Sequence, residues 1–152
     1  MKKYIFPVFT SVVIGTIMAV LLINSYDNKK ALTVAKNVQT VYYIQRGVYS
    51  NKDSMKENMS EFESYIYNKK EGKYYTYIGM SQNKENAEKL KEYYKKQGYE
   101  TIIKEKHTDN TNFLTVLSQY DKLLESTDNT QTINVICNQI LSKYEELVNN
   151  EY

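Results

Sequence analysis

The sequence predicts an α+β fold: a β-α-β-β-α-β domain, preceded by an apolar anchor and followed by a helical hairpin. Residues 38–105 read as one unit written twice, because a shift of 32 positions lays Tyr42 over Tyr74 and Gly47 over Gly79. Each copy starts with the alternation of a strand and then changes to helical spacing. The chain of 152 residues has room for one compact domain and an accessory segment.

The amino end predicts a signal anchor over residues 1–25. Residues 4–23 carry no charge, and about twenty apolar residues match the hydrocarbon thickness that a helix must cross. Lys2 and Lys3 stand before this run, which favours a cytoplasmic amino terminus and a carboxyl-terminal part outside the cell membrane. A cleaved export signal is the alternative, but its apolar core is normally shorter and ends in a small-x-small site. Residues 26–37 then form a linker.

The first copy predicts a strand over residues 42–49, a helix, and a short strand near residues 66–67. The strand is rich in aromatic and β-branched types, which suit a pleated surface. Ser50 and Asp53 are compatible with a capped helix start. The residues expected on one face of the helical segment are Met55, Met59, Phe62 and Ile66.

The second copy predicts a strand over residues 74–79, a helix, and a strand over residues 101–104. Asn83 is a good N-cap, and Gly98 is a good residue to end the helix. Ala87, Leu90 and Tyr94 share the apolar face of this helix. In a β-α-β-β-α-β order we expect both helices on one face of the sheet and the other face open.

The carboxyl end, residues 107–152, predicts two helices joined by a turn at residues 126–129. Asn110 or Thr111 is expected to start the first helix and Thr130 the second. Each helix carries an apolar stripe that has to be buried. The two stripes are expected either to pack on each other and on the repeated unit or to pair with another chain, and we favour packing within the chain. The two apolar stripes are Phe113, Val116, Leu117, Tyr120, Leu123 and Leu124, and Ile133, Ile136, Cys137, Ile140, Leu141, Tyr144, Leu147 and Val148.

Composition excludes several classes of function. Without Lys2 and Lys3, 18 basic residues balance 18 acidic ones, which argues against a nucleic-acid binder. Cys137 is the single cysteine, so one chain cannot form a disulfide or a thiolate metal site. We expect His107 to be an exposed loop residue. Since no phosphate loop, paired histidine set or activated nucleophile is recognisable, we expect no enzyme, no catalytic residue, no metal and no cofactor.

Alternation along the two main strands predicts a solvent-facing surface. If Tyr42, Ile44 and Val48 face the helices, the residues between them face the other way. Exposed aromatics gathered on one face usually mark an interaction surface. The alternation turns Arg46 toward the helices, where its charge would be buried. A bulge at Gly47, or an extended side chain that carries the guanidinium to the edge of the sheet, would avoid this burial. The outward residues are Tyr43, Gln45, Gly47, Tyr49, Tyr75 and Tyr77.

Two short motifs resemble a known family. Tyr43-Ile44-Gln45-Arg46-Gly47-Val48-Tyr49 is similar to the first strand of SPOR (sporulation-related repeat) domains, and residues 72–79 with Asn83 to Leu90 resemble the third strand and second helix. The resemblance covers about 70 residues of the chain. It implies a ferredoxin-like, non-enzymatic module that binds peptidoglycan glycan strands in cell division or sporulation.

The residue types on the predicted face fit such a ligand. Tyrosine packs against the C–H faces of a sugar and hydrogen-bonds its hydroxyls, while Gln45 supplies an amide. Gly47 would let a strand approach the glycan closely. We therefore assign glycan binding to Tyr43, Gln45, Gly47, Tyr49, Tyr75 and Tyr77. The alternative is that these tyrosines cover the sheet under another element.

The second candidate function is a membrane-tethered protein-interaction module of a division or sporulation complex. In that hypothesis the sheet face or the carboxyl-terminal hairpin binds a protein partner and glycan affinity is absent. Arg46 and the absence of an aromatic at Ser81 favour it, and they belong to a set of four departures from the family motifs. Arg46, Met55, Met80 and Ser81 stand where SPOR domains commonly have, respectively, a small or apolar residue, alanine, proline and an aromatic.

Overall fold

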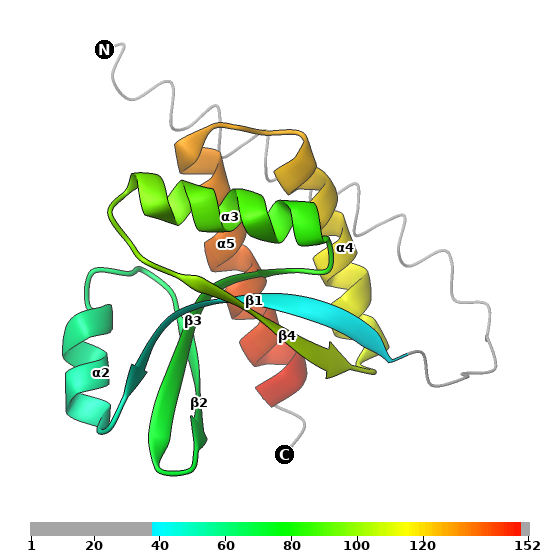
Figure 1. The fold of residues 1–152 in the computed structure, drawn as a ribbon. Coiled ribbons are helices and arrows are strands. Elements are labelled where there is room, and N and C mark those ends of the chain that lie inside the picture. The colour runs from blue at the N-terminus through cyan, green and yellow to red at the C-terminus, as the bar shows by residue number, and fades with distance from the viewer. Residues whose placement is uncertain (1–37, 150–152) are drawn as a thin grey trace, which may run out of the picture. The chain divides into compact units, whose positions relative to one another are not determined.

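The structure is a computed structural model that describes residues 38–149 (Figure 1). The expected signal anchor (residues 1–25) and linker (26–37) lie outside the described residues. Within the described part of the chain, no helix has both the length and the apolar character needed to cross a membrane.

A four-stranded antiparallel sheet forms the centre of the described part. Its strands are β1 (Gln39–Tyr49), β2 (Ile66–Lys70), β3 (Lys73–Ser81) and β4 (Ile102–Thr108). Helix α2 (Lys52–Met59) follows β1, and helix α3 (Lys84–Lys96) follows β3. The strand order is β2-β3-β1-β4, so the first strands of the two repeated copies are central neighbours (Figure 1). The predicted α+β class and the β-α-β-β-α-β element order are confirmed.

The two edge strands differ from the central ones in composition. The edge strand β2 is five residues long and ends in Lys69 and Lys70, and the edge strand β4 carries Lys104 and Lys106. A two-residue turn joins β2 to β3, with positive φ angles of 53° at Glu71 and 75° at Gly72. Two positive φ angles match the twist of a tight hairpin. Charged side chains and short length protect both edges from pairing with another strand.

Helix α3 begins and ends where the sequence indicates. The Asn83 side chain accepts a hydrogen bond of 2.8 Å from the backbone N–H of Glu85. After the helix, Gly98 has a φ of +88° and donates from its N–H to the Lys95 carbonyl at 3.0 Å. A left-handed residue at this position closes a helix, and glycine adopts it without strain.

Helix α2 is shorter than its residue spacing predicts. Its N-cap is Asn51, whose side chain accepts from the Ser54 N–H at 2.8 Å, so the expected start at Ser50 is one residue early. The helix ends at Met59, and Ile66 belongs to β2. Phe62 therefore lies in the connection, where its ring packs on Tyr99 with centroids 4.8 Å apart. Only Met55 and Met59 of the expected apolar face are buried in the helix itself.

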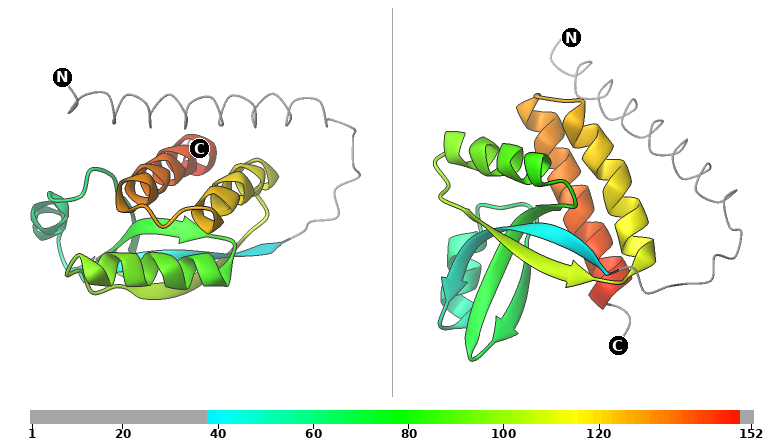
Figure 2. Two further views of the ribbon diagram at one scale, coloured as in Figure 1. Left: turned by 90° about the horizontal axis from the view of Figure 1, so that it is seen from above. Right: turned by 45° about the vertical axis from the view of Figure 1, so that its right-hand side comes forward.

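The carboxyl-terminal hairpin consists of α4 (Thr111–Glu125) and α5 (Thr130–Tyr144), with a π-helical extension over Glu145–Asn149. Asn110 and Asn129 cap the two helices through their side chains. Figure 2 shows α4 and α5 side by side, forming a layer over the sheet. The apolar stripes are buried within the chain, including Phe113, Leu117, Leu124, Ile136, Cys137, Ile140 and Leu141.

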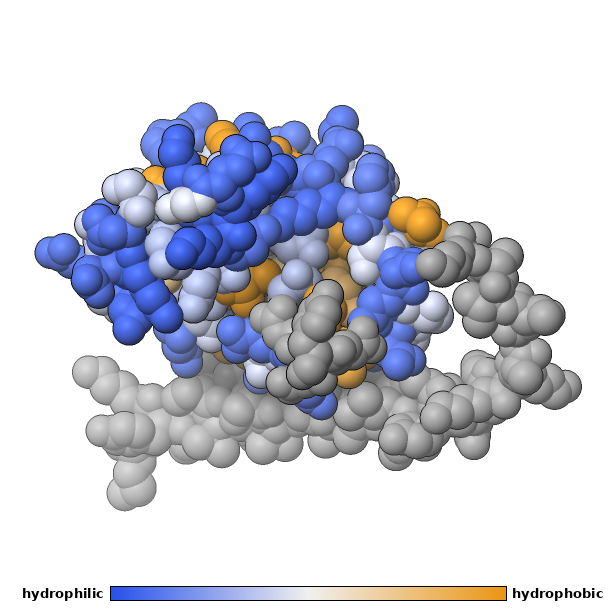
Figure 3. Space-filling model, turned by 90° about the horizontal axis from the view of Figure 1, so that it is seen from below, coloured by the Kyte–Doolittle hydropathy of each residue, from blue (hydrophilic) through white to orange (hydrophobic). Residues whose placement is uncertain are grey.

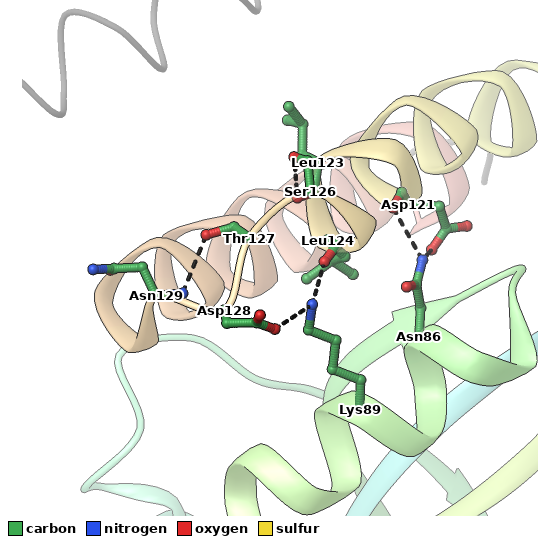
Figure 4. A network of polar contacts seen from close by, with 9 residues as sticks. All are labelled: Asn86, Lys89, Asp121, Leu123, Leu124, Ser126, Thr127, Asp128 and Asn129. Carbon is green, nitrogen blue, oxygen red and sulfur yellow. Dashed lines mark hydrogen bonds and ion pairs between the residues drawn. The ribbon is translucent and has the colours of Figure 1, made fainter.

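A buried carboxylate joins this hairpin to the repeated unit. Asp121 of α4 is 5 % exposed and accepts hydrogen bonds from the Ser81 hydroxyl, from the Gln82 N–H at 2.9 Å and from the Asn86 amide at 3.2 Å. The same amide also donates to the Asp121 carbonyl at 3.0 Å (Figure 4). Burial raises the pKa of Asp121, and the three donors oppose that rise. The carboxylate is therefore held by bonds that an uncharged, non-polar side chain cannot replace.

A second contact lies one helical turn away on α3. The Lys89 ammonium donates to the Leu124 carbonyl at 2.8 Å and pairs with the Asp128 carboxylate at 2.9 Å (Figure 4). The Asp128 side chain is 95 % exposed, so this ion pair is screened by water and contributes little. The Lys89 bond to a helix-terminal carbonyl satisfies a group that lacks an intrahelical partner.

We expect Asp121→Ala to lower the free energy of unfolding by about 2 kcal/mol, because the Gln82 N–H would lose its acceptor and the Ser81 hydroxyl and Asn86 amide would each keep only a backbone carbonyl. Urea titration followed by circular dichroism measures this change. The matched control is Asp128→Ala, which removes a carboxylate from the same interface at an exposed position and should leave the unfolding midpoint unchanged. Equal effects of the two substitutions would show that the Asp121 contacts do not hold the hairpin.

Candidate functional site

A groove of about 260 Å³ crosses the sheet on the side that Tyr43, Tyr75 and Tyr77 face. The strand order explains its shape, because β3 and β1 supply the floor and the two edge strands supply the sides. The lining residues come from all four strands and from the β2–β3 turn. They are Gln45, Asn68, Lys70, Glu71, Tyr75, Tyr77, Lys104, Glu105 and Lys106.

Three of the six predicted glycan-binding residues line this groove: Gln45, Tyr75 and Tyr77. Strand pairing brings them together, since Gln45 of β1 stands opposite Tyr77 of β3. Tyr75 is half-buried, so part of its ring is open to solvent. The groove thus combines aromatic rings with the amides of Gln45 and Asn68.

The expectation of an open, solvent-facing sheet surface is wrong for three residues. Tyr43, Gln45 and Tyr77 are only 4 %, 5 % and 4 % exposed. The hairpin is the reason for Tyr43, whose ring meets Tyr144 of α5 edge-on at a centroid distance of 6.0 Å. Tyr77 in turn packs on Tyr43 at 5.3 Å. Burial raises the pKa of both tyrosine hydroxyls.

The predicted alternation of β1 is correct where the strand is regular. Ile44 is fully buried, and around Gly79 its side chain lies near Leu90 of α3 and Cys137 of α5. Its neighbour Tyr43 lies on the other side, against Tyr144. What the alternation could not show is that α5 covers this second side at Tyr43.

Gly47 and Tyr49 serve the fold at a different place and do not line the groove. A Cβ atom at Gly47 would lie 2.5 Å from the Tyr49 hydroxyl oxygen and within 2.9 Å of two ring carbons. The Tyr49 hydroxyl itself donates to the Met59 sulfur of α2 at 3.7 Å. The missing side chain of Gly47 therefore makes room for the Tyr49 ring.

Arg46 is accommodated by an irregularity in β1. The register with β3 shifts on both sides of Gln45, and Arg46 has no partner between Gln45 and Gly47. Its guanidinium lies over the Tyr99 ring, 5.5 Å from the centroid. The Arg46 Nε is buried without a hydrogen bond. The bulge expected near Gly47 is thus present at Arg46. Because Arg46 is the extra residue of this bulge, its side chain does not have to follow the alternation of the strand, and it lies outside the groove.

Sequence reasoning missed the basic lining of the groove, which is Lys70 on the edge strand β2 and Lys104 and Lys106 on the opposite edge strand β4. The Lys106 ammonium lies over two rings, 4.1 Å from the Tyr77 centroid and 4.5 Å from the Tyr43 centroid. Burial lowers the pKa of Lys106. Pairing of β4 with β1 sets Lys104 opposite Tyr43 and Lys106 opposite Val41. The two-residue spacing of these lysines was visible in the sequence, but their strand partner was not.

Over residues 38–149, no group of three or more His, Cys, Asp and Glu side chains is placed to hold a metal ion. His107 is exposed as expected, but it lies on β4 and not in a loop, with its Nδ1 3.2 Å from the Thr40 hydroxyl. The surface seen from below is largely hydrophilic, and apolar residues show only as small areas among charged and polar ones (Figure 3). The lining of the groove suits a polar, ring-shaped ligand.

We expect Gly47→Ala to destabilise the fold by about 1 to 3 kcal/mol, because the new methyl group overlaps the Tyr49 ring. The same substitution in a Tyr49→Leu background should cost much less, since the overlapping atoms are gone. Thermal unfolding of the four proteins of this double-mutant cycle measures the coupling. Additive effects would show that Gly47 is required for a reason other than the Tyr49 ring.

Comparison with known proteins gives no relative: neither a family model, nor a curated protein, nor a solved structure matches this chain.

Proposed function

We propose that this protein is a membrane-anchored, extracytoplasmic SPOR-like module that binds the glycan strands of peptidoglycan in cell division or sporulation. The groove across the sheet is the observation that carries the proposal. It brings tyrosine rings, amide side chains and ammonium groups together on one surface.

Glycan chemistry matches this lining. A sugar ring has C–H groups on its faces, which pack on tyrosine rings such as Tyr75, and hydroxyl groups around its rim. The amides of Gln45 and Asn68 each offer donors and acceptors for those hydroxyls. The burial of Tyr77 makes it the base of the groove, so that the partly exposed ring of Tyr75 is the main stacking surface.

The chain order supports the family resemblance. A β-α-β-β-α-β sequence of elements with the antiparallel order β2-β3-β1-β4 is the arrangement expected of a ferredoxin-like domain. In this proposal residues 38–106 form the SPOR-like domain, residues 4–23 anchor it in the membrane with the amino terminus in the cytoplasm, and the protein binds its ligand without catalysis.

A membrane-tethered protein-interaction module is the second candidate. The burial of Tyr43, Gln45 and Tyr77 favours it, because three of the six predicted contact residues are withdrawn from the surface. The hairpin would then supply the contact. Val135 on α5 is a large apolar residue of that hairpin that stays 39 % exposed.

We expect the full chain, purified in a mild detergent, to sediment with purified peptidoglycan sacculi. Gln45→Ala combined with Tyr75→Ala should weaken retention about tenfold, because a stacking ring and an amide are lost. The matched control is Tyr67→Ala on the same β2–β3 hairpin. Tyr67 is 42 % exposed and stands opposite Thr76, so it faces away from the groove. Absence of wild-type retention, or equal retention of the groove variant and the wild type, would contradict glycan binding.

Septal localisation of a fluorescent fusion separates the two candidates. Glycan binding predicts that the Gln45→Ala, Tyr75→Ala variant leaves the septum and that Val135→Asp stays there. The protein-interaction hypothesis predicts the reverse. A single exposed substitution is the suitable change on the hairpin, because deleting the hairpin would also remove Asp121 and expose the buried face of the sheet.

A further inference from the structure

A second pocket, of about 290 Å³, lies where three parts of the chain meet, and it shares no residue with the groove on the sheet. Its lining comes from the connection between α2 and β2, from the end of α3 with the turn that follows, and from α5 (Figure 1). Two hydrogen bonds join these parts at the pocket. The Tyr99 hydroxyl donates to the Glu61 carboxylate at 3.3 Å, and the Asn138 amide of α5 donates to the Glu63 carboxylate at 2.6 Å. Docking of the hairpin therefore completes the pocket.

Part of the lining is aromatic and is held in place by the core. The Phe62 and Tyr99 rings both line the pocket, with their centroids 4.8 Å apart. Tyr94 packs on Phe62 at a centroid distance of 6.5 Å, and its hydroxyl donates to the Ile78 carbonyl of β3 at 2.6 Å. Rings that are already fixed lose little freedom when a ligand packs on them.

The charges that line the pocket have one sign. They are the carboxylates of Glu61 and Glu63, and no lysine, arginine or histidine belongs to the lining. Neither carboxylate makes an ion pair with another of the described residues. The Arg46 guanidinium lies over the Tyr99 ring, 5.5 Å from its centroid, but does not line the pocket. A concave surface lined by a single sign of charge focuses its field and raises the local concentration of ligands of the opposite charge.

We infer that this pocket binds an alkylammonium group, carried either by a small amine or by the lysine side chain of a polypeptide. The ammonium offers three N–H donors, which the oxygens of Glu61, Glu63 and Asn134 can accept. Its charge is also attracted to the faces of aromatic rings, and its alkyl chain can pack on them.

The size and the ligand types of the pocket narrow the choice of cation. A volume of about 290 Å³ is at the lower end of the range for small-molecule sites, so the pocket takes one small amine or one side chain. A metal ion fits the described residues less well, because among residues 38–149 no group of three or more His, Cys, Asp and Glu side chains is placed to hold one.

Titration of the full chain in a mild, uncharged detergent, followed by nuclear magnetic resonance, tests the inference with two matched probes. One is Nα-acetyl-lysine methylamide, and the other is Nα-acetyl-norleucine methylamide, which has the same alkyl chain without the ammonium group. We expect the lysine probe to bind at least about fivefold more tightly at low salt, a preference that falls as salt is added. The signals that shift should include those of residues 61–64 and 134–138.

Glu61→Gln combined with Glu63→Gln should remove the preference, because the amides keep the size of the side chains and lose their charge. The matched control is Glu57→Gln, an exposed position of α2 that does not line the pocket and should behave as the wild type. A third probe, n-pentylammonium, identifies the source of the group. Binding as tight as that of the lysine probe indicates a free amine, and weaker binding indicates a lysine within a polypeptide.

Equal binding of the lysine and norleucine probes by the wild type, or binding of neither, would overturn the inference. A preference that persists in the double variant would place the ammonium elsewhere on the protein and would overturn it as well. The wild-type comparison needs no substitution, so it decides the question even if the double variant is unstable. None of these results bears on glycan binding, since the two sites have no residue in common.

Discussion

The arrangement of this molecule depends on one buried carboxylate. Asp121 accepts hydrogen bonds from Ser81 at the end of β3, from the following backbone N–H, and from Asn86 in α3. These groups belong to segments about forty residues apart in the sequence. The bonds fix the direction of α4, and α4 fixes α5 through the shared apolar stripes. The end of α5 then places Tyr144 on Tyr43.

The position of the hairpin decides what the sheet can present to a ligand. Without α5, the second face of the sheet would be a broad aromatic surface running from Tyr43 to Tyr75. With α5 in place, Tyr43 becomes part of the interior and the accessible part narrows to the groove between the edge strands. The hairpin is thus an integral layer of the fold, and one consequence of its docking is a smaller, more polar site with lysines on both edge strands.

Local signals predicted the elements well. Asn83 and Gly98 were recognisable as the start and end of α3 because capping chemistry is local, and the side of Ile44 followed from alternation alone. The site was predicted only in part. Burial of Tyr43 depends on Tyr144, about a hundred residues away, and the position of Lys104 and Lys106 depends on which strand β4 joins. The bulge at Arg46 was foreseen as one of two options, because strand phase and charge conflict there.

The lysine-bearing margins of the sheet set a limit on how copies of this protein can meet. One edge strand is only five residues long, and the other carries charges of alternating sign. Neither edge therefore offers a long apolar strand with which a strand of a neighbouring chain could pair. Edge-to-edge pairing of strands between two copies is therefore disfavoured, even where many copies gather at high density on one surface.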